Sequence, residues 1–186
     1  IIADNITYGE DLEIIVVLSS FNITGKLTIY INDNPMEVDV VNGIAKIKLS
    51  GLNAGMYAIF VSFEGNEKYS PVSDYIMLEV YKADPVLNVI IKDINYGEIF
   101  DIDVVLTGFK SVCLYGNVTV VLNDKTYQVE VKNGRGTLSG VKLPVGSYEF
   151  SANWNGNDNY NSAQDSGKFN VNKVTPVMDV DVDDIN

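Results

Sequence analysis

Apolar and polar residues alternate with a period of two along most of this chain. In residues 12–18 the side chains of Leu12, Ile14, Val16 and Leu18 fall on one face, and in residues 100–106 those of Phe100, Ile102, Val104 and Leu106 do the same. Successive side chains of a β-strand point to opposite faces of the sheet, so this alternation is typical of strands with one buried face. No stretch has the period of an amphipathic helix, and the pattern predicts an all-β protein.

Turn signals separate the predicted strands at short intervals. Residues 32–35 (Asn-Asp-Asn-Pro) and 123–125 (Asn-Asp-Lys) each lie between two alternating stretches and predict hairpins. The pairs Asn42–Gly43 and Asn133–Gly134 suit two-residue type I′ turns, because both residue types tolerate positive φ. About seven strands result in each half of the chain, which favours immunoglobulin-like sandwich domains.

The two halves of the chain are copies of one another. Residues 6–10 match residues 94–98, and the pair Asn42–Gly43 matches Asn133–Gly134 at an offset larger by three residues. The three extra residues lie between Phe109 and Gly116. A repeat of about ninety residues is too long for a propeller blade of about 40 to 50, and it fits a sandwich domain.

The repeat predicts three segments in the chain. Residues 1–82 form a first domain whose first strand is largely missing, residues 83–173 a second domain, and residues 174–186 the first strand of a truncated third repeat. The linkers at 81–85 and 172–176 are short and poor in Gly and Ser, so we expect a semi-rigid rod. Because the chain starts on Ile, we interpret it as a piece of a longer protein.

The residues that both copies retain are of types that suggest a structural role. Tyr57 and Tyr148 each follow a Gly-x pair and enter a long strand, which predicts the tyrosine corner of sandwich folds. The motif Gly-Asn-x-x-Tyr at 65–69 recurs at 156–160 and predicts a turn with its tyrosine packed beneath it. Calcium binding by acidic residues near these loops is the alternative, but the carboxylates are too few, and we predict no metal site.

The amino-acid composition excludes several classes of function. The 186 residues are 46% hydrophobic, and 13 basic against 25 acidic residues give a net charge of −12, which repels nucleic acids and anionic membrane surfaces. The chain has no His and one Cys, and it has neither a phosphate-binding loop nor an apolar run of about 20 residues for a membrane span. We therefore predict a protein that is not an enzyme, needs no cofactor and has no membrane insertion in this segment.

Candidate contact residues lie where the copies differ or where aromatic residues approach loops. They are Phe109, Lys110, Cys113 and Tyr115 around the insertion, and Trp154 and Tyr160 near the last loop. Asn5, Asn22 and Asn117 begin Asn-x-Thr sequences and are candidate N-glycosylation sites.

The repeated motifs also carry a family resemblance. Tyr-Gly at 8–9, Asn-Gly at 42–43, Gly-Met-Tyr at 55–57 and the loop 65–69, with their counterparts in the second copy, resemble bacterial immunoglobulin-like repeats of large surface proteins, notably adhesin-like proteins of methanogenic archaea. The resemblance spans both copies. It implies extracellular, non-catalytic modules repeated in tandem as a stalk or a binding region.

Three functions are consistent with these observations. The first is a stalk or spacer of a cell-surface adhesin that also offers an adhesion surface, with a glycan or protein of a host or neighbouring cell as partner. The alternatives are a module that binds carbohydrate or protein directly, and accessory repeats of a secreted enzyme.

The ends of the chain predict one more contact. In the second copy, residues 85–91 supply the first strand, and the first copy keeps only residues 1–3 of the equivalent strand. Residues 176–182 resemble residues 85–91 in sequence. An open sheet edge pairs readily with another strand, so we expect strand exchange with another copy of the chain.

Overall fold

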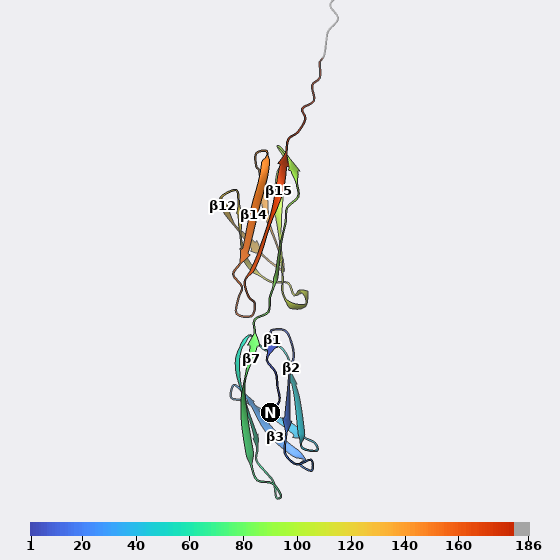
Figure 1. Cartoon of the computed structure of the whole chain (residues 1–186), viewed down its shortest axis with the longest axis vertical. Helices are drawn as coiled ribbons and strands as arrows, with labels where there is room; N and C mark the ends of the chain where they lie inside the picture. The colour runs from blue at the N-terminus through green and yellow to red at the C-terminus, as the bar shows by residue number, and fades with distance from the viewer. Residues whose placement is uncertain (181–186) are drawn as a thin grey trace, which may run out of the picture. The chain divides into compact units, whose positions relative to one another are not determined.

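The computed structural model describes residues 1–180, which form an all-β structure (Figure 1). This part of the chain contains fifteen strands and a single 3₁₀ turn. None of its helical segments has the length and apolar character that crossing a membrane requires. The prediction of an all-β fold built from tandem sandwich domains is confirmed.

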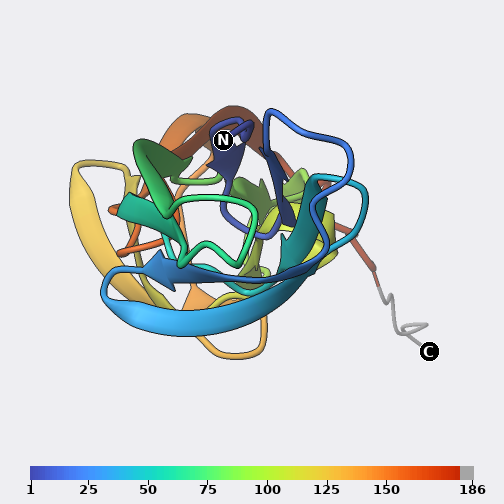
Figure 2. The ribbon, with the colours of Figure 1, turned by 90° about the horizontal axis from the view of Figure 1, so that it is seen from below.

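The first sandwich consists of two sheets. One sheet has the strand order β1-β7-β6-β3-β4 and the other pairs β2 with β5, so that β1 and β4 lie at opposite edges of the larger sheet (Figure 2). The strand β1 runs parallel to β7, and all other neighbours are antiparallel. The strands are β1 Ile6–Thr7, β2 Leu12–Val17, β3 Gly25–Ile31, β4 Asn34–Val40, β5 Ile44–Leu49, β6 Gly55–Phe63 and β7 Val72–Tyr81.

The second sandwich repeats this plan. Its sheets have the orders β12-β11-β14-β15-β9 and β13-β10-β8, and β9 again runs parallel to the last strand, β15. The strands are β8 Val86–Ile90, β9 Ile94–Asn95, β10 Phe100–Thr107, β11 Gly116–Leu122, β12 Lys125–Val131, β13 Arg135–Val141, β14 Gly146–Trp154 and β15 Ala163–Asn172, and the 3₁₀ turn η1 spans Phe109–Ser111.

The two sandwiches differ by one strand. The first has seven strands, as predicted, whereas the second has eight because β8 pairs with β10 along its whole length. Within residues 1–180, the pairing along the corresponding edge of β2 in the first sandwich is a bridge between Ile2 and Ile15.

The alternating residues form the cores. Ile14, Ile29 and Ile59 of the first sandwich, and Ile102 and Val104 of the second, have no exposed surface. Full burial of one such side chain contributes about 1.5–3 kcal/mol before the entropy cost of ordering is subtracted. No polar or charged side chain is buried within residues 1–180, so each sandwich is stabilised by an apolar interior.

The Asn-Gly turns have the predicted geometry. Asn42 and Gly43 have φ of 53° and 77°, and Asn133 and Gly134 have φ of 52° and 76°. Positive φ at both positions is the signature of a type I′ turn, whose twist matches that of the flanking strands.

The described residues divide into two compact units. One contains Ile1–Pro85, Gly108–Lys110 and Gly156–Ser162, and the other contains Val86–Thr107, Ser111–Asn155 and the residues from Ala163 onward. The repeat boundaries at 82/83 and 173/174 remain predictions.

Candidate functional site

The Gly-Asn-x-x-Tyr loop of the first copy is closed by its asparagine. The Oδ1 atom of Asn66 accepts hydrogen bonds from the backbone N–H groups of Lys68 at 2.9 Å and Tyr69 at 3.0 Å. The Asn66 N–H donates to the Tyr69 carbonyl at 2.8 Å. An asparagine oxygen used in this way organises a turn.

The second copy repeats these bonds. The Oδ1 atom of Asn157 accepts from the N–H groups of Asn159 and Tyr160, both at 2.9 Å, and the Asn157 N–H donates to the Tyr160 carbonyl at 3.0 Å. The glycine before each asparagine has positive φ, 82° at Gly65 and 79° at Gly156. Backbone geometry thus explains why both copies retain this motif.

Tyr57 and Tyr148 lie in equivalent positions. The Tyr57 hydroxyl donates to the Asn53 carbonyl at 3.0 Å, and the Tyr148 hydroxyl donates to the Pro144 carbonyl at 2.8 Å. The Tyr148 ring also stacks on Phe169, with ring centroids 5.7 Å apart. A bond from the hydroxyl to the backbone four residues upstream is what a tyrosine corner requires, and we keep this role as a proposal.

Two of the candidate contact residues are buried. Trp154 is 3% exposed, and a Cβ atom on Gly116 would approach its Nε1 to 2.7 Å. Tyr160 is 4% exposed; burial raises the pKa of its hydroxyl, and a hydrogen bond with the Phe109 backbone acts in the opposite direction. The predicted contact surface is corrected accordingly, because neither side chain is available to a ligand at the surface.

The insertion loop presents the other candidates. The Lys110 ammonium lies 5.0 Å from the centre of the Phe109 ring, a cation–π distance. Tyr115 is 63% exposed, and Cys113 is exposed and forms no disulfide. These four residues, Phe109, Lys110, Cys113 and Tyr115, remain candidates for contact with a ligand.

The three candidate glycosylation sites differ in their surroundings. The Nδ2 atom of Asn5 donates to the Tyr81 hydroxyl and its Oδ1 atom accepts from the Glu79 N–H, both at 2.8 Å. All three asparagines are exposed. A glycan on Asn5 would have to displace the bond to Tyr81, so Asn22 and Asn117 are the stronger candidates for glycosylation, which stays a prediction.

No metal site is found among residues 1–180, where acidic residues and Cys113 nowhere gather in groups of three that could hold an ion. The acidic run Asp179–Asp184 extends beyond the described residues after Val180.

An exposed aromatic row crosses the larger sheet of the first sandwich. Tyr30 of β3 lies opposite Phe60 of β6, and Phe60 lies opposite Tyr75 of β7. The ring centroids of Tyr30 and Phe60 are 5.7 Å apart, and Phe60 and Tyr75 are 41% and 70% exposed. Pro35 of β4 lies opposite Tyr30 and extends the row to a fourth strand.

The second sandwich lacks this row. Val121, Ser151 and Ser166 form its corresponding cross-strand set. The retained residues of the repeat could not identify the row, because it lies on an outward face where the copies differ. The signal in the sequence is the difference between the two copies at these outward positions, where the first copy has aromatic residues and the second has Val121, Ser151 and Ser166.

Each sandwich has two sheets whose neighbouring strands are antiparallel except for one parallel pair. This arrangement defines two immunoglobulin- or fibronectin III-like domains. No known protein family and no curated protein matches the chain. Solved structures do: the titin domains z1z2 in complex with telethonin are 14% identical over 93% of this chain and 94% of theirs, with a TM-score of 0.50.

Two further solved structures are similar over most of their length. A segment of two fibronectin type III domains from chicken tenascin is 15% identical over 91% of this chain and 97% of that one, with a TM-score of 0.48. The fibronectin(III)-like modules of Clostridium thermocellum CbhA are 15% identical over 93% and 91%, with a TM-score of 0.40. At these identities the likeness concerns the fold alone.

Proposed function

We propose that this chain consists of non-catalytic tandem domains of an extracellular, cell-surface protein of the adhesin-like type, and that the domains serve as a spacer. The observation that carries the proposal is one sandwich plan built twice in succession, with only residues 82–85 between β7 and β8. The resemblance of the repeated motifs to immunoglobulin-like repeats of archaeal adhesin-like proteins supports it.

The strand pairing suits a spacer under tension. In each sandwich a strand near the beginning runs parallel to the last strand, β1 beside β7 and β9 beside β15. A force applied to the two ends of such a domain shears the hydrogen bonds between these strands together. In an antiparallel hairpin pulled from its open end, the bonds break one after another.

Pulling on the two ends of the intact chain in a single-molecule experiment is therefore expected to give two separate unfolding events. The two events should release roughly 27 and 30 nm of chain, less the length of each folded domain, because an extended residue spans at most about 3.5 Å and the sandwiches cover residues 6–81 and 86–172. The matched control, in a Cys113→Ser background, has cysteine handles at Lys26 and Asp39, which lie opposite each other in the β3–β4 hairpin. It should yield at a clearly lower force, and equal forces in the two geometries would contradict the spacer mechanism.

A second candidate function, direct binding of a carbohydrate or protein partner, is favoured by the aromatic row of Tyr30, Phe60 and Tyr75. Aromatic side chains offer a large contact area at a low entropy cost and are enriched at binding surfaces. The Lys26 ammonium pairs with Glu37 at 2.6 Å on the same sheet, so these two charges offset each other. A neutral surface partner is consistent with this arrangement.

Replacing the row with the residues of the second sandwich tests this candidate. The triple variant Tyr30→Val, Phe60→Ser and Tyr75→Ser should fold normally, because the second sandwich carries these residues at the same places. If the row binds, the variant loses at least about tenfold in affinity on glycan arrays or cell surfaces, which corresponds to about 1.4 kcal/mol. The matched control is Phe21→Ser, which removes an aromatic side chain that is 75% exposed and lies outside the row. Unaltered binding by the triple variant would eliminate the row as the contact surface.

A further inference from the structure

The larger sheet of the first sandwich has an apolar outward face. Beside the aromatic row, Met77 of β7 lies opposite Ala58 of β6, and Met56 precedes Ala58 by two residues on the same strand. Met56 and Met77 are 56% and 54% exposed. Together with the row they form one surface, the aromatic face, which consists of Tyr30, Met56, Ala58, Phe60, Tyr75 and Met77.

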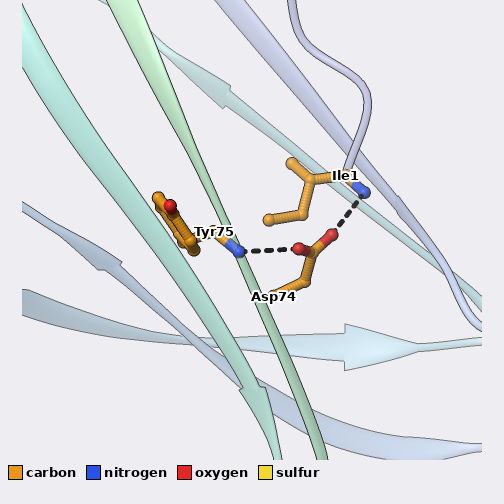
Figure 3. A network of polar contacts seen from close by, with 3 residues as sticks. All are labelled: Ile1, Asp74 and Tyr75. Carbon is orange, nitrogen blue, oxygen red and sulfur yellow. Dashed lines mark hydrogen bonds and ion pairs between the residues drawn. The ribbon is translucent and has the colours of Figure 1, made fainter.

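Charged side chains lie outside the aromatic face or at its margin. Asp74, the neighbour of Tyr75, points to the other side of β7, where one carboxylate oxygen lies 3.5 Å from the Ile1 amino nitrogen (Figure 3). The other oxygen accepts a hydrogen bond from the Tyr75 N–H at 2.9 Å. Glu79 lies opposite Met56, at the end of the face. An apolar partner can therefore cover the centre of the face without burying a charge.

The second sandwich has polar residues at the same places. Glu149 and Lys168 lie opposite each other where the first sandwich has Ala58 and Met77, and their charges pair. Both sandwiches share one plan, so folding does not require the aromatic face. Protein interfaces are enriched in Tyr, Phe and Met and depleted in Ser, Glu and Lys. The aromatic face therefore has the composition of a protein interface.

The row has a geometry that suits another sheet. The rings of Tyr30 and Phe60 are inclined at 53° to each other, so they form ridges and not a flat platform. Side chains of two packed sheets interdigitate between such ridges. Across β3, β6 and β7 the row reads Tyr-Phe-Tyr and is symmetric about Phe60. A two-fold axis through Phe60 thus matches the row with itself.

We propose that the aromatic face binds the aromatic face of a second copy of the chain. The two-fold axis runs parallel to the strands over β6, so that Phe60 meets Phe60, and Tyr75 of each copy meets Tyr30 of the other. Such a contact uses the same surface on both copies and closes as a dimer. The strands of the two packed sheets are then aligned within about 30°. The dimer supplies a protein partner for the second candidate function, on which it rests, and it is independent of the spacer role.

The positions of the other side chains favour this axis. Strand β3 ends at Ile31, at the level of Ile76 on β7, so no residue of β3 in the second copy faces Glu79. An axis along the row would instead place Met77 against Ser73 of the second copy. The axis parallel to the strands keeps charges apart and lets apolar residues face one another.

The contact belongs to the weak, transient class. The exposed parts of the aromatic face amount to roughly 500 Å² per copy, since a whole aromatic side chain buries about 150–250 Å². Two faces together bury on the order of 1,000 Å², and interfaces below about 1,200 Å² are weak. The net charge of −12 also repels the copies at low salt. We therefore expect dimers near millimolar concentration, and more of them at high salt.

Cross-linking tests the axis. In a Cys113→Ser background, Ala58→Cys chains are treated with a short bismaleimide. We expect a covalent dimer, because the two cysteines face each other across sheets about 10 Å apart. The matched control is Glu149→Cys, at the same position in the second sandwich. Equal yields for the two variants would overturn the two-fold contact.

A mixture of two variants tests the register. Thr28 and Ser73 both lie opposite Ser62, beside the aromatic row, and the axis places Thr28 of one copy against Ser73 of the other. Mixing Thr28→Cys chains with Ser73→Cys chains should give more cross-linked dimer than either variant alone. In each single variant the two cysteines are displaced sideways by two strand spacings, about 10 Å. A single variant that cross-links as well as the mixture would refute this register.

Sedimentation of the intact chain measures the association. Ala58→Glu should weaken it at least about tenfold, because two carboxylates then meet at the axis within an apolar contact. This variant should fold normally, since Glu149 occupies the same place in the second sandwich. Phe21→Glu adds the same charge at a 75% exposed position outside the face and should associate like the unmodified chain.

Equal effects of the two glutamate variants would refute the dimer, and so would a chain that stays monomeric at millimolar concentration and high salt. Sedimentation uses the purified chain alone, so it is separate from the glycan-array test of the row. A monomeric chain whose row binds a glycan would refute the dimer and keep the second candidate function.

Discussion

Replacing Trp154 with alanine is expected to lower the free energy of unfolding of the second sandwich by about 3–5 kcal/mol. The indole is 3% exposed, at the end of β14, and Gly116 leaves the space into which its Nε1 edge fits. Truncation removes this buried surface and leaves a cavity that neighbouring β-strands can close only in part. Since a natural domain is stable by about 5–15 kcal/mol, the loss would be a large part of the total.

Denaturant unfolding measures this loss, and hydrogen exchange in β14 and in β6 assigns it to the second sandwich. The matched control is Tyr115→Ala, an aromatic truncation at a 63% exposed position, which should change stability by less than about 0.5 kcal/mol. If Trp154 contacted a ligand and did not stabilise the core, Trp154→Ala would lower the free energy of unfolding no more than Tyr115→Ala does. That result would contradict the prediction.

Strands with one buried face could be predicted well from the sequence. A shift of one residue would move every apolar side chain of β2 or β10 from the core to the solvent, so their alternation fixes which face is buried. The parallel pairing of β1 with β7, and of β9 with β15, could not be predicted, because β1 and β9 have two residues each and are too short to show a period.

The contact residues were harder to predict. The alternation of Phe150, Ala152 and Trp154 along β14 predicts that Trp154 faces inward, and its burial agrees with that pattern. Its choice as a contact residue relied on its closeness to a loop in the sequence. Periodicity was the better guide there, because an inward strand position remains inward up to the last residue of the strand.

The aromatic row shows the opposite limit. Tyr30, Phe60 and Tyr75 are far apart in the sequence, and only the register of three strands brings them into one line. A single strand pattern contains no information on cross-strand register, so the row could be recognised only after the pairing was known.

Gly156 is the residue of the retained loop motif whose replacement we expect to cost most. An alanine there would place its Cβ 2.5 Å from the Tyr160 carbonyl oxygen and 2.9 Å from that of Asn161, and φ is +79°. Gly140 is a matched control, because its φ is +81° and a Cβ there meets no atom within 4 Å. Gly140→Ala should therefore show only the cost of a left-handed conformation, about 1–2 kcal/mol.

Gly156→Ala should add a further cost of about 1–3 kcal/mol, since the obstructing atoms belong to the backbone and the loop must shift to make room. Such a shift would pull the N–H groups of Asn159 and Tyr160 away from the Asn157 oxygen that they share. Urea unfolding of the two variants gives both values, and hydrogen exchange at the Tyr160 N–H reports the loop directly. If Gly156→Ala and Gly140→Ala lower the free energy of unfolding equally, the close approach of the backbone does not explain why the motif is retained. A binding role for this loop would then have to be tested.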